Sequence, residues 1–441
     1  MRSYVLIGAA ALVAAAPAPA PQAFDPAAIG ALPSIAQGPP VGIGAASQTA
    51  YNQGQAQTKA AAAAVGPKTA PKAKRDADVV EARTNKLKAG PAYGASYNTT
   101  SNAAYATPTY GTPYGQSSSQ AAYDATPTSS QSATCTPIGG SNNGDYTPST
   151  NPSDACAPQP SAYGPPTVPD TAQNFKNNKV YHNMAKSASA PAGYEQSFVN
   201  LDAATHGNGY IAYKSLESYD VLACSSWCDL TTTCTGFNVY IERDPAWNPT
   251  QCSCTNPPSV ANYKCSLWGQ PVDSSSATNT GAGSGDFEVV ITSSNGYNKK
   301  TYTPANPPNT SNPKDCGTKL INQPQANMGQ STFPGPFDPS LCAAYAQKQN
   351  DVNRKADVLS WALSLLGMNK AACVQFQAAY LMKDGMGFGT HCRLFTQKFT
   401  PAQATYDISS GSYGTAGWSV SKSFIWDVNS QASFNWGSKS Y

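Results

Sequence analysis

The chain has few charged residues for its length. Lys, Arg, Asp and Glu make up 12% of its 441 residues, and the formal net charge is +3. A nucleic-acid-binding protein needs a concentrated basic face, which this composition does not provide. We therefore expect no nucleic-acid partner, and no motif in the chain calls for a cofactor.

Long hydrophobic runs are also absent. A membrane-spanning helix needs about 20 apolar residues, and the stretch Val5–Ala16 is shorter than that. With Arg2 before it and the small residues Val13-Ala14-Ala15 at its end, it has the organisation of a secretory signal peptide rather than of a membrane anchor. The C-terminal sequence FNWGSKSY carries no hydrophobic tail, which argues against a glycolipid anchor. We expect a signal peptide at 1–20 and a secreted protein, extracellular or associated with the cell wall, without a membrane anchor.

Histidine is scarce, which restricts acid–base chemistry. The chain has three histidines, His182, His206 and His391, and none accompanies a G-x-S-x-G nucleophile motif. A carboxylate pair drawn from Glu242, Asp244, Asp286 and Glu288 would be a better hydrolase hypothesis, but the spacing singles out no two partners. We therefore predict that the protein is not an enzyme.

The N-terminal part lacks the apolar residues that a core needs. Residues 21–75 are rich in Ala and Pro, so we expect them to be disordered. The dibasic pair Lys74-Arg75 ends this stretch, which predicts a propeptide cut after Arg75 by a kexin-type protease; the alternative is an ordinary solvated basic cluster. Residues 76–191 are rich in Ser, Thr, Pro and Tyr and predict a glycosylated low-complexity spacer, with an N-glycosylation sequon at Asn98.

Cysteine, in contrast, is plentiful. The chain has twelve cysteines, an even number that predicts disulfides in an oxidising compartment. The dense stretch Cys224–Cys234 could also be drawn as part of a zinc site or a redox loop. A zinc site is disfavoured because the cysteines of a secreted protein are in an oxidising compartment. A redox loop is disfavoured because neither C-x-x-x-C nor C-x-C follows a thioredoxin-like pattern. We therefore predict disulfides and no metal.

An internal repeat divides the remaining chain. Four motifs occur in the same order from Asp220 and again from Asp338. They are D-x-x-x-C, C-x-x-F leading into a strand, C-x-L-aromatic, and a final strand. Cys224 and Cys228 are four residues apart, so on a helix they share one face. The alternation after Cys234 predicts a strand with one face covered by that helix. We expect modules at 192–295 and 335–441, joined by a linker at 296–334 with a second sequon at Asn309.

These motifs resemble the PAN/apple domain, in tandem proteins secreted by filamentous ascomycetes. The resemblance covers about 192–292 well and 335–428 more loosely, and it implies an α+β fold with two small disulfide-stapled modules. It also implies the disulfides Cys224–Cys265, Cys228–Cys234 and Cys342–Cys392. Ala346 stands where the second module would have the equivalent of Cys228, which leaves Cys316 as the candidate partner of Cys373.

The other cysteines leave several pairings open. Cys135 and Cys156 could close a local loop, and Cys252 and Cys254 could pair with each other. Either of the last two could instead reach Cys135, Cys156 or Cys316.

Exposed aromatic residues are the one binding signal. Trp247, in a DPAWNP turn, is the best candidate for an exposed ring that stacks on a ligand, and Tyr240 lies on the polar face of the preceding strand. Apple modules bind proteins or carbohydrates, so the resemblance implies a noncatalytic binding or adhesion protein. Its expected partner is a polysaccharide or an extracellular protein, and its oligomeric state stays open. The alternative is a glycosylated wall component without a discrete ligand; a wall-polymer-modifying enzyme is disfavoured.

Overall fold

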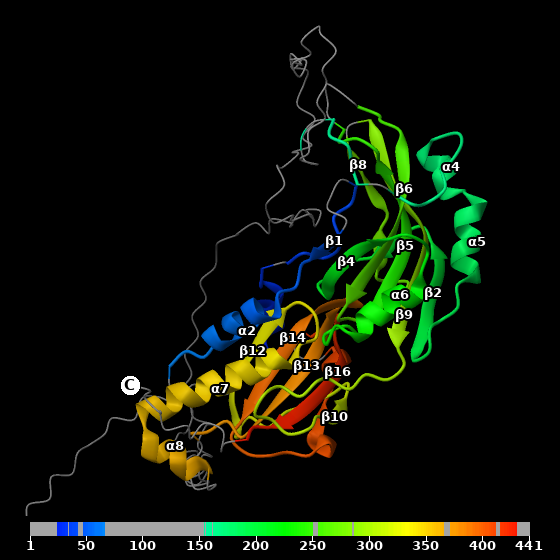
Figure 1. Ribbon diagram of the computed structural model, residues 1–441. Helices are drawn as coiled ribbons and strands as arrows, with labels where there is room; N and C mark the ends of the chain where they lie inside the picture. Colours follow the sequence, from blue (N-terminus) through cyan, green and yellow to red (C-terminus); the bar gives the residue numbers. More distant parts are fainter. Residues whose placement is uncertain are drawn as a thin grey trace, which may run out of the picture.

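The computed structural model describes residues 24–33, 35–42, 47–66, 154, 156–160, 162–249, 255–284, 286–365, 371–411 and 415–429. The predicted signal peptide, the pair Lys74-Arg75, the sequon at Asn98 and the cysteines Cys135, Cys252 and Cys254 lie outside these residues. The described part forms two modules, drawn mainly in green and in yellow to red (Figure 1). Within it, no helix combines the length and apolar character needed to cross a membrane.

The first module contains a 7-stranded antiparallel sheet. Its strand order is β1-β4-β6-β5-β9-β2, with β8 beside β9. The strands are β1 (Ser47–Thr49), β2 (Tyr194–Leu201), β4 (Tyr210–Leu216), β5 (Gly236–Pro245), β6 (Ser259–Trp268), β8 (Gly281–Ser284) and β9 (Phe287–Lys299). Two short strands, β3 (Ala204–Thr205) and β7 (Ala277–Asn279), pair with each other.

Three helices cover one face of this sheet. They are α4 (Ala172–Lys176), α5 (Lys179–Ser187) and α6 (Val221–Asp229). α6 begins at Asp220, whose carboxylate accepts the backbone N–H of Ala223 at 2.8 Å, as a good N-cap residue does. Phe175, Tyr181 and Cys224 from these helices belong to one core cluster with Phe237 and Leu267 of the sheet.

The second module has a 5-stranded antiparallel sheet in the order β10-β16-β13-β14-β12. Its strands are β10 (Lys314–Gly317), β12 (Asn327–Pro334), β13 (Gln375–Lys383), β14 (Met386–Phe395) and β16 (Trp418–Asp427). The helices α7 (Pro339–Ala356) and α8 (Val358–Leu365) follow β12. The small elements are β11 (Leu320–Ile321), β15 (Ala404–Tyr406) and the 3₁₀ turns η2 (Pro401–Gln403) and η3 (Ile408–Ser410).

The two sheets share one chain topology. In the first module, a strand, a helix and three further strands follow as β4-α6-β5-β6-β9; in the second they follow as β12-α7-β13-β14-β16. The lateral orders β4-β6-β5-β9 and β12-β14-β13-β16 are then the same. A repeat predicted from four short motifs is thus matched by the strand order of the two sheets. The fold is α+β with antiparallel sheets, as expected.

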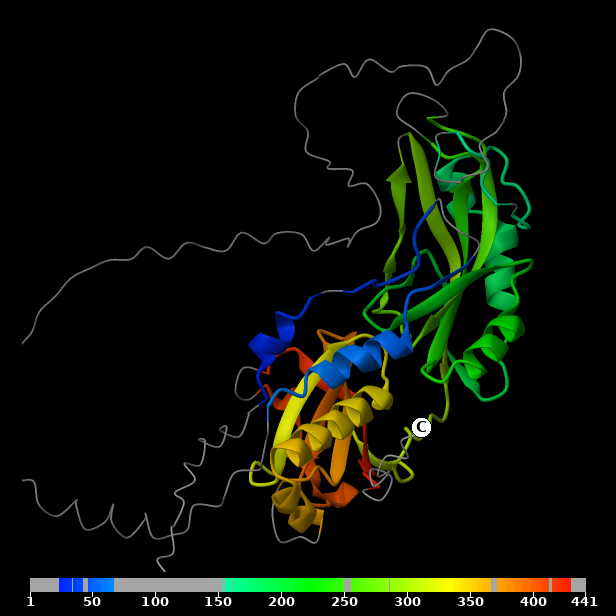
Figure 2. The ribbon, with the colours of Figure 1, turned by 60° about the vertical axis from the view of Figure 1, so that its left-hand side comes forward.

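The described residues between 24 and 66, which we call the N-terminal segment, are folded onto both modules. They contain α1 (Pro26–Gly30), β1 and α2 (Gln53–Ala62), and α2 lies along α7 in both views (Figures 1 and 2). The prediction of disorder for 21–75 is therefore wrong for these residues. They cannot form a core alone, but Phe24 and Ile29 bury against the second module, and β1 pairs with β4.

Two predicted boundaries also need correction. Helices α4 and α5 fall within the predicted spacer at 76–191, since Phe175 and Tyr181 complete the core of the first module. The predicted linker at 296–334 contains the end of β9 and all of β10, β11 and β12. Short strands of this kind gain their stability from neighbours distant in sequence, which local composition does not reveal.

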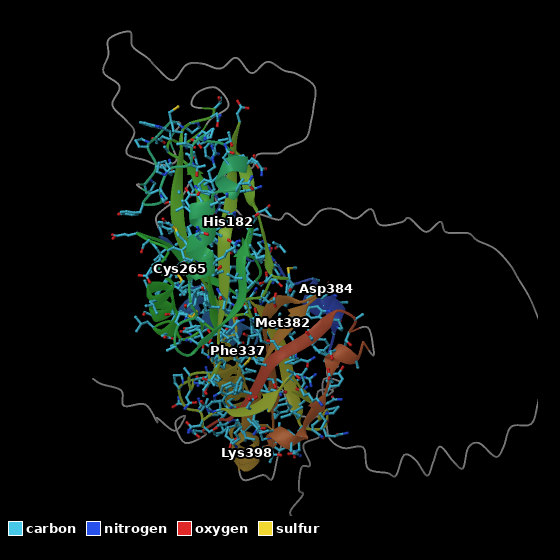
Figure 3. The ribbon with its side chains drawn as sticks, turned by 90° about the vertical axis from the view of Figure 1, so that its right-hand side faces the viewer. His182, Cys265, Phe337, Met382, Asp384 and Lys398 are labelled. Carbon is cyan, nitrogen blue, oxygen red and sulfur yellow. A yellow bond between two sulfur atoms is a disulfide. The ribbon has the colours of Figure 1, made fainter. Side chains whose placement is uncertain are left out.

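The modules contact each other directly. The backbone N–H of Phe337 donates to the carbonyl of Gly269 at 3.0 Å, and the Asn208 side chain donates to the Phe388 carbonyl at 3.2 Å. A Cβ atom on Gly269 would lie 2.3 Å from Cβ of Pro336, so this contact requires glycine. Figure 3 shows Phe337 at the level where the first module meets the second.

Candidate functional site

The second face of the first module's sheet is polar but closed to solvent. Along β5, Asn238, Tyr240 and Glu242 point away from the helices, and sequence alternation predicted that this face would be exposed. Instead the whole strand is buried. The N–H of Thr205 donates to Asn238 at 2.9 Å, and the N–H of Gly42 donates to Glu242 Oε1 at 2.9 Å. Strand β3 and the N-terminal segment therefore cover this face.

Beneath this cover lies a cluster of buried charges. Lys264 Nζ lies 2.5 Å from Glu242 Oε1 and 3.6 Å from Asp244 Oδ2. Asn262 Nδ2 donates to Asp244 Oδ2 at 2.7 Å. The alternation of β5 puts both carboxylates on one face, and the register of β6 brings Lys264 beside them. Of the four carboxylates considered from sequence, Glu242 and Asp244 are thus brought together, whereas Asp286 and Glu288 are exposed.

The charge balance of this cluster is set by burial. Desolvation, followed by the negative charge of Asp244, raises the pKa of Glu242 to about 8, although Lys264 opposes the rise. The two carboxylates raise the pKa of Lys264 despite its own burial. At neutral pH the stable state therefore has a protonated Glu242 beside a charged Lys264.

Three buried oxygens in this region have no hydrogen-bond partner: Glu242 Oε2, Asp244 Oδ1 and the Tyr240 hydroxyl. Glu242 has no exposed surface, so a substrate cannot reach its carboxyl group while the cover is in place. Over the described ranges, no group of three or more His, Cys, Asp or Glu side chains could hold a metal ion. As folded, the cluster holds the second face of the sheet together through charge and hydrogen bonds.

The three histidines lie in separate surroundings. His391 on β14 is buried next to Thr332, with Nδ1 2.8 Å from its hydroxyl. Burial, and then the nearby Arg393 guanidinium, lowers its pKa well below the usual value, so the ring is neutral. Burial also lowers the pKa of His206, and His182 Nδ1 lies 2.8 Å from Asn200 Oδ1. The Thr332 hydroxyl lies at hydrogen-bond distance from a His391 nitrogen, as in a nucleophile–base pair, but both side chains are buried, so a substrate cannot reach them in the folded protein.

The exposed aromatic candidate Trp247 lies at the far end of the first module. Strand β5 starts at Gly236, beside the contact with the second module, and reaches Pro245 about 30 Å away, the length expected for ten strand residues. Trp247 follows and is 37% exposed. Two backbone hydrogen bonds hold this turn, from Gln159 to Ala246 at 3.0 Å and from Asn248 to Ala157 at 2.8 Å. The ring is thus presented from a fixed backbone.

A second exposed aromatic residue, Tyr163, lies at the same end. It is 58% exposed, and the next residue, Gly164, donates its N–H to the Ala261 carbonyl at 3.0 Å. Sequence analysis missed Tyr163 because it sits in the predicted spacer. The surrounding Pro-rich sequence SAYGPPTVP, which favours an extended backbone, was the available signal. We call Trp247 and Tyr163 together the distal aromatic surface.

Tyr240 does not belong to this surface. Its side chain has no exposed area and packs with Ala204 and Ile291. The prediction that it contacts a ligand is wrong, because strand β3 covers the sheet face that alternation assigned to solvent.

Three disulfides join the helices and loops to the sheets. Cys224–Cys265 and Cys342–Cys392 connect α6 to β6 and α7 to β14, with Cα–Cα distances of 5.8 and 5.1 Å. Cys228–Cys234, at 5.3 Å, connects the end of α6 to the entry of β5. These are the three pairs implied by the family resemblance. Cys156 is also disulfide-bonded, and its partner lies outside the described residues.

The suggested Cys316–Cys373 pair is absent, and both residues are buried free thiols. Cys316 packs with Ile321 and Phe395 in one cluster, whereas Cys373 packs with Ala346 and Cys342 in another. Strand β16 separates β10, which carries Cys316, from β13, which follows Cys373. Burial raises the pKa of Cys316 to about 11 and that of Cys373 to about 12, so neither is a reactive thiolate at neutral pH.

The sequon at Asn309 lies in the connection between β9 and β10, where the asparagine is exposed. It has a left-handed backbone, with φ at 62°, and its carbonyl accepts the N–H of Asn429 at 2.9 Å. Its side chain therefore faces solvent on a fixed turn.

No family model, no curated protein and no solved structure matches this chain. The apple-like character of the modules therefore remains a prediction from their motifs.

Proposed function

We propose that the protein is a secreted, noncatalytic binding protein whose apple-like modules attach it to a carbohydrate through the distal aromatic surface. The supporting observation is the presentation of Trp247 and Tyr163 from backbone held by hydrogen bonds at one end of the first module. Aromatic faces stack on the apolar faces of sugar rings, and a fixed ring loses little conformational entropy on binding.

The surroundings of these rings favour a neutral polysaccharide over a protein. Protein interfaces have a buried apolar centre of several adjoining residues. Here the backbone next to the rings carries the polar residues Gln159 and Ser259, and Ser259 hydrogen-bonds the exposed carboxylate of Asp170. Such groups suit hydroxyl-rich ligands. The low charge of the whole chain agrees with a partner of low charge.

The state of the buried carboxylates supports a noncatalytic role. Glu242 and Asp244 form the one pair of candidate acids that the fold brings together, and their cover closes them to any polymer. The disulfides suit an oxidising extracellular compartment.

Retention of the full chain on insoluble chitin and β-glucan tests this proposal. The substitution Trp247→Ala should reduce retention about tenfold or more, the effect of losing one anchor worth about 1.4 kcal/mol. Tyr163→Ala should give a smaller loss, and Leu230→Ala, at an exposed position just beyond α6, should leave retention unchanged. Absence of retention on both polymers would overturn the proposal and favour a wall component without a discrete ligand.

A further inference from the structure

The N-terminal segment binds side chains of both modules in turn. On the first module, Gln37 Nε2 donates to Asn208 Oδ1 at 2.8 Å. Further along, Ser47–Thr49 adds a strand to the exposed edge of β4, with Gln48 opposite Tyr213. An extended peptide that extends a sheet in this way gains its main-chain hydrogen bonds irrespective of whether it is covalently attached.

On the second module, the same segment engages the start of α7. The Tyr51 hydroxyl donates to Asp338 Oδ2 at 2.7 Å, and Gln57 Nε2 donates to Ser340 Oγ at 2.8 Å. At the end of the segment, the carbonyl of Gly66 accepts from Gln349 Nε2 at 3.0 Å.

Apolar side chains secure both ends of the segment. Phe24 and Ile29 join a cluster with Trp418 and Leu381 on the second module, and the Phe24 ring meets that of His391 edge-on at 5.6 Å. Near the other end, Ala64 joins the core cluster under α7. The segment therefore lies across both modules, with apolar anchors at each end and polar contacts between them.

The single Lys-Arg pair of the sequence, Lys74-Arg75, lies just beyond the last of these contacts. No cysteine precedes Cys135, so nothing N-terminal to that pair can be held by a disulfide. We propose that cleavage after Arg75 does not release a propeptide but produces a two-chain protein, in which residues 24–66 stay bound noncovalently to both modules through these contacts.

The cleavage is a hydrolysis of the Arg75–Asp76 peptide bond. One water is consumed, Arg75 gains a carboxylate and Asp76 gains an amino group, and the protease supplies the catalysis. The contacts of residues 24–66 are unchanged by this step, because none of them involves the bond that is cut.

Digestion of the full chain with a kexin-type protease tests the proposal. Native mass spectrometry after size exclusion should find one species, heavier than the uncut chain by one water, while denaturing electrophoresis should show two pieces. The Arg75→Ala variant should remain a single piece in both measurements. This readout does not involve a carbohydrate, so it succeeds or fails independently of the function proposed above.

Variants at the contacts of the segment check that these contacts hold the retained piece. The double change Tyr51→Phe and Gln57→Ala should speed release of the cut segment at least tenfold, whereas Lys59→Ala, at an exposed position of α2, should not. Separate elution of the two pieces from native wild-type protein would overturn retention. Failure of the protease to cut at Arg75 would overturn the processing itself.

Discussion

The Tyr51 hydroxyl donates a hydrogen bond to Oδ2 of Asp338, which lies 287 residues further along the chain. Asp338 is also the N-cap of α7, since its Oδ1 accepts the N–H of Ser340 at 2.9 Å. One buried carboxylate therefore both starts the longest described helix of the second module and anchors the N-terminal segment. The stability of α7 and the docking of that segment are coupled through this side chain.

We expect Tyr51→Phe to destabilise the protein by about 1–2 kcal/mol, because a buried hydrogen bond to a charged acceptor is lost while the ring stays in place. Urea unfolding followed by circular dichroism measures this change. Tyr163→Phe is the matched control, since Tyr163 is exposed and its hydroxyl should contribute nothing. Equal stability of the two variants would show that the bond to Asp338 does not hold the segment.

Glu242 should make the protein less stable as the pH rises. The pKa of Glu242 is about 8 in the folded protein and about 4.3 in an unfolded chain. At pH values between these two, Glu242 therefore holds a proton in the folded state that it has lost in the unfolded state. Stability contributed by this proton is complete below about pH 4 and is lost as the pH rises towards 8. Glu242→Gln should remove this decline. The variant should therefore gain stability relative to wild type, on the order of 5 kcal/mol by pH 8.

Denaturant unfolding at several pH values between 4 and 9 measures the difference. Glu288→Gln, at an exposed position on the adjacent strand β9, provides the control and should track the wild type. A constant difference between Glu242→Gln and wild type across this range would show that Glu242 is ionised in the folded protein.

Removal of the cation should be more damaging than removal of an acid. Lys264→Met leaves Glu242 and Asp244 without their positive partner in a closed site, and breaking a buried ion pair in this way costs about 3–5 kcal/mol. Adding Asp244→Asn to Lys264→Met should recover part of the loss, because it removes a carboxylate that has lost its cation. Lys186→Met, at an exposed position of α5, should change the unfolding free energy little; a loss as large as that for Lys264→Met would assign the effect to something other than the buried cluster.

The second module should accept a disulfide equivalent to Cys228–Cys234, which it lacks. Ala346 and Cys373 share one core cluster, and Asn350, one helical turn beyond Ala346, accepts the N–H of Cys373 at 2.7 Å. We therefore expect Ala346→Cys to form a disulfide with Cys373 and to stabilise the oxidised protein by about 2–4 kcal/mol relative to the reduced form. Non-reducing peptide mapping checks the bond. Lys348→Cys, exposed on α7, should keep a free thiol, and a free thiol at position 346 would contradict the structural equivalence with Cys228.

The parts of the fold that sequence predicted are those fixed by local chemistry. Asp220 and Asp338 mark helix starts because their side chains cap the adjacent N–H groups. The Cys-x-Leu-aromatic motifs locate strands because the cysteine must face the helix that it bonds. The topology shared by the two modules follows from these positions.

The parts that sequence did not predict depend on distant partners. Nothing in the composition of residues 24–66 indicates order, because Phe24 finds its neighbours in the second module and Tyr51 finds them in both modules. Tyr240 follows the alternation of an exposed face, and only strand β3 closes that face. The cluster of Glu242, Asp244 and Lys264 is likewise visible only once the register of β5 and β6 is known.

The position of the N-terminal segment also sets an order of assembly. This segment is synthesised first, yet its strand β1 needs β4, and its helix α2 needs α7. It must therefore wait until the second module has emerged and folded, and the closure of so long a loop adds an entropic barrier at the last step. During synthesis, the edge of β4 and the start of α7 stay open until the chain is complete, and a chain that stops early would keep them open.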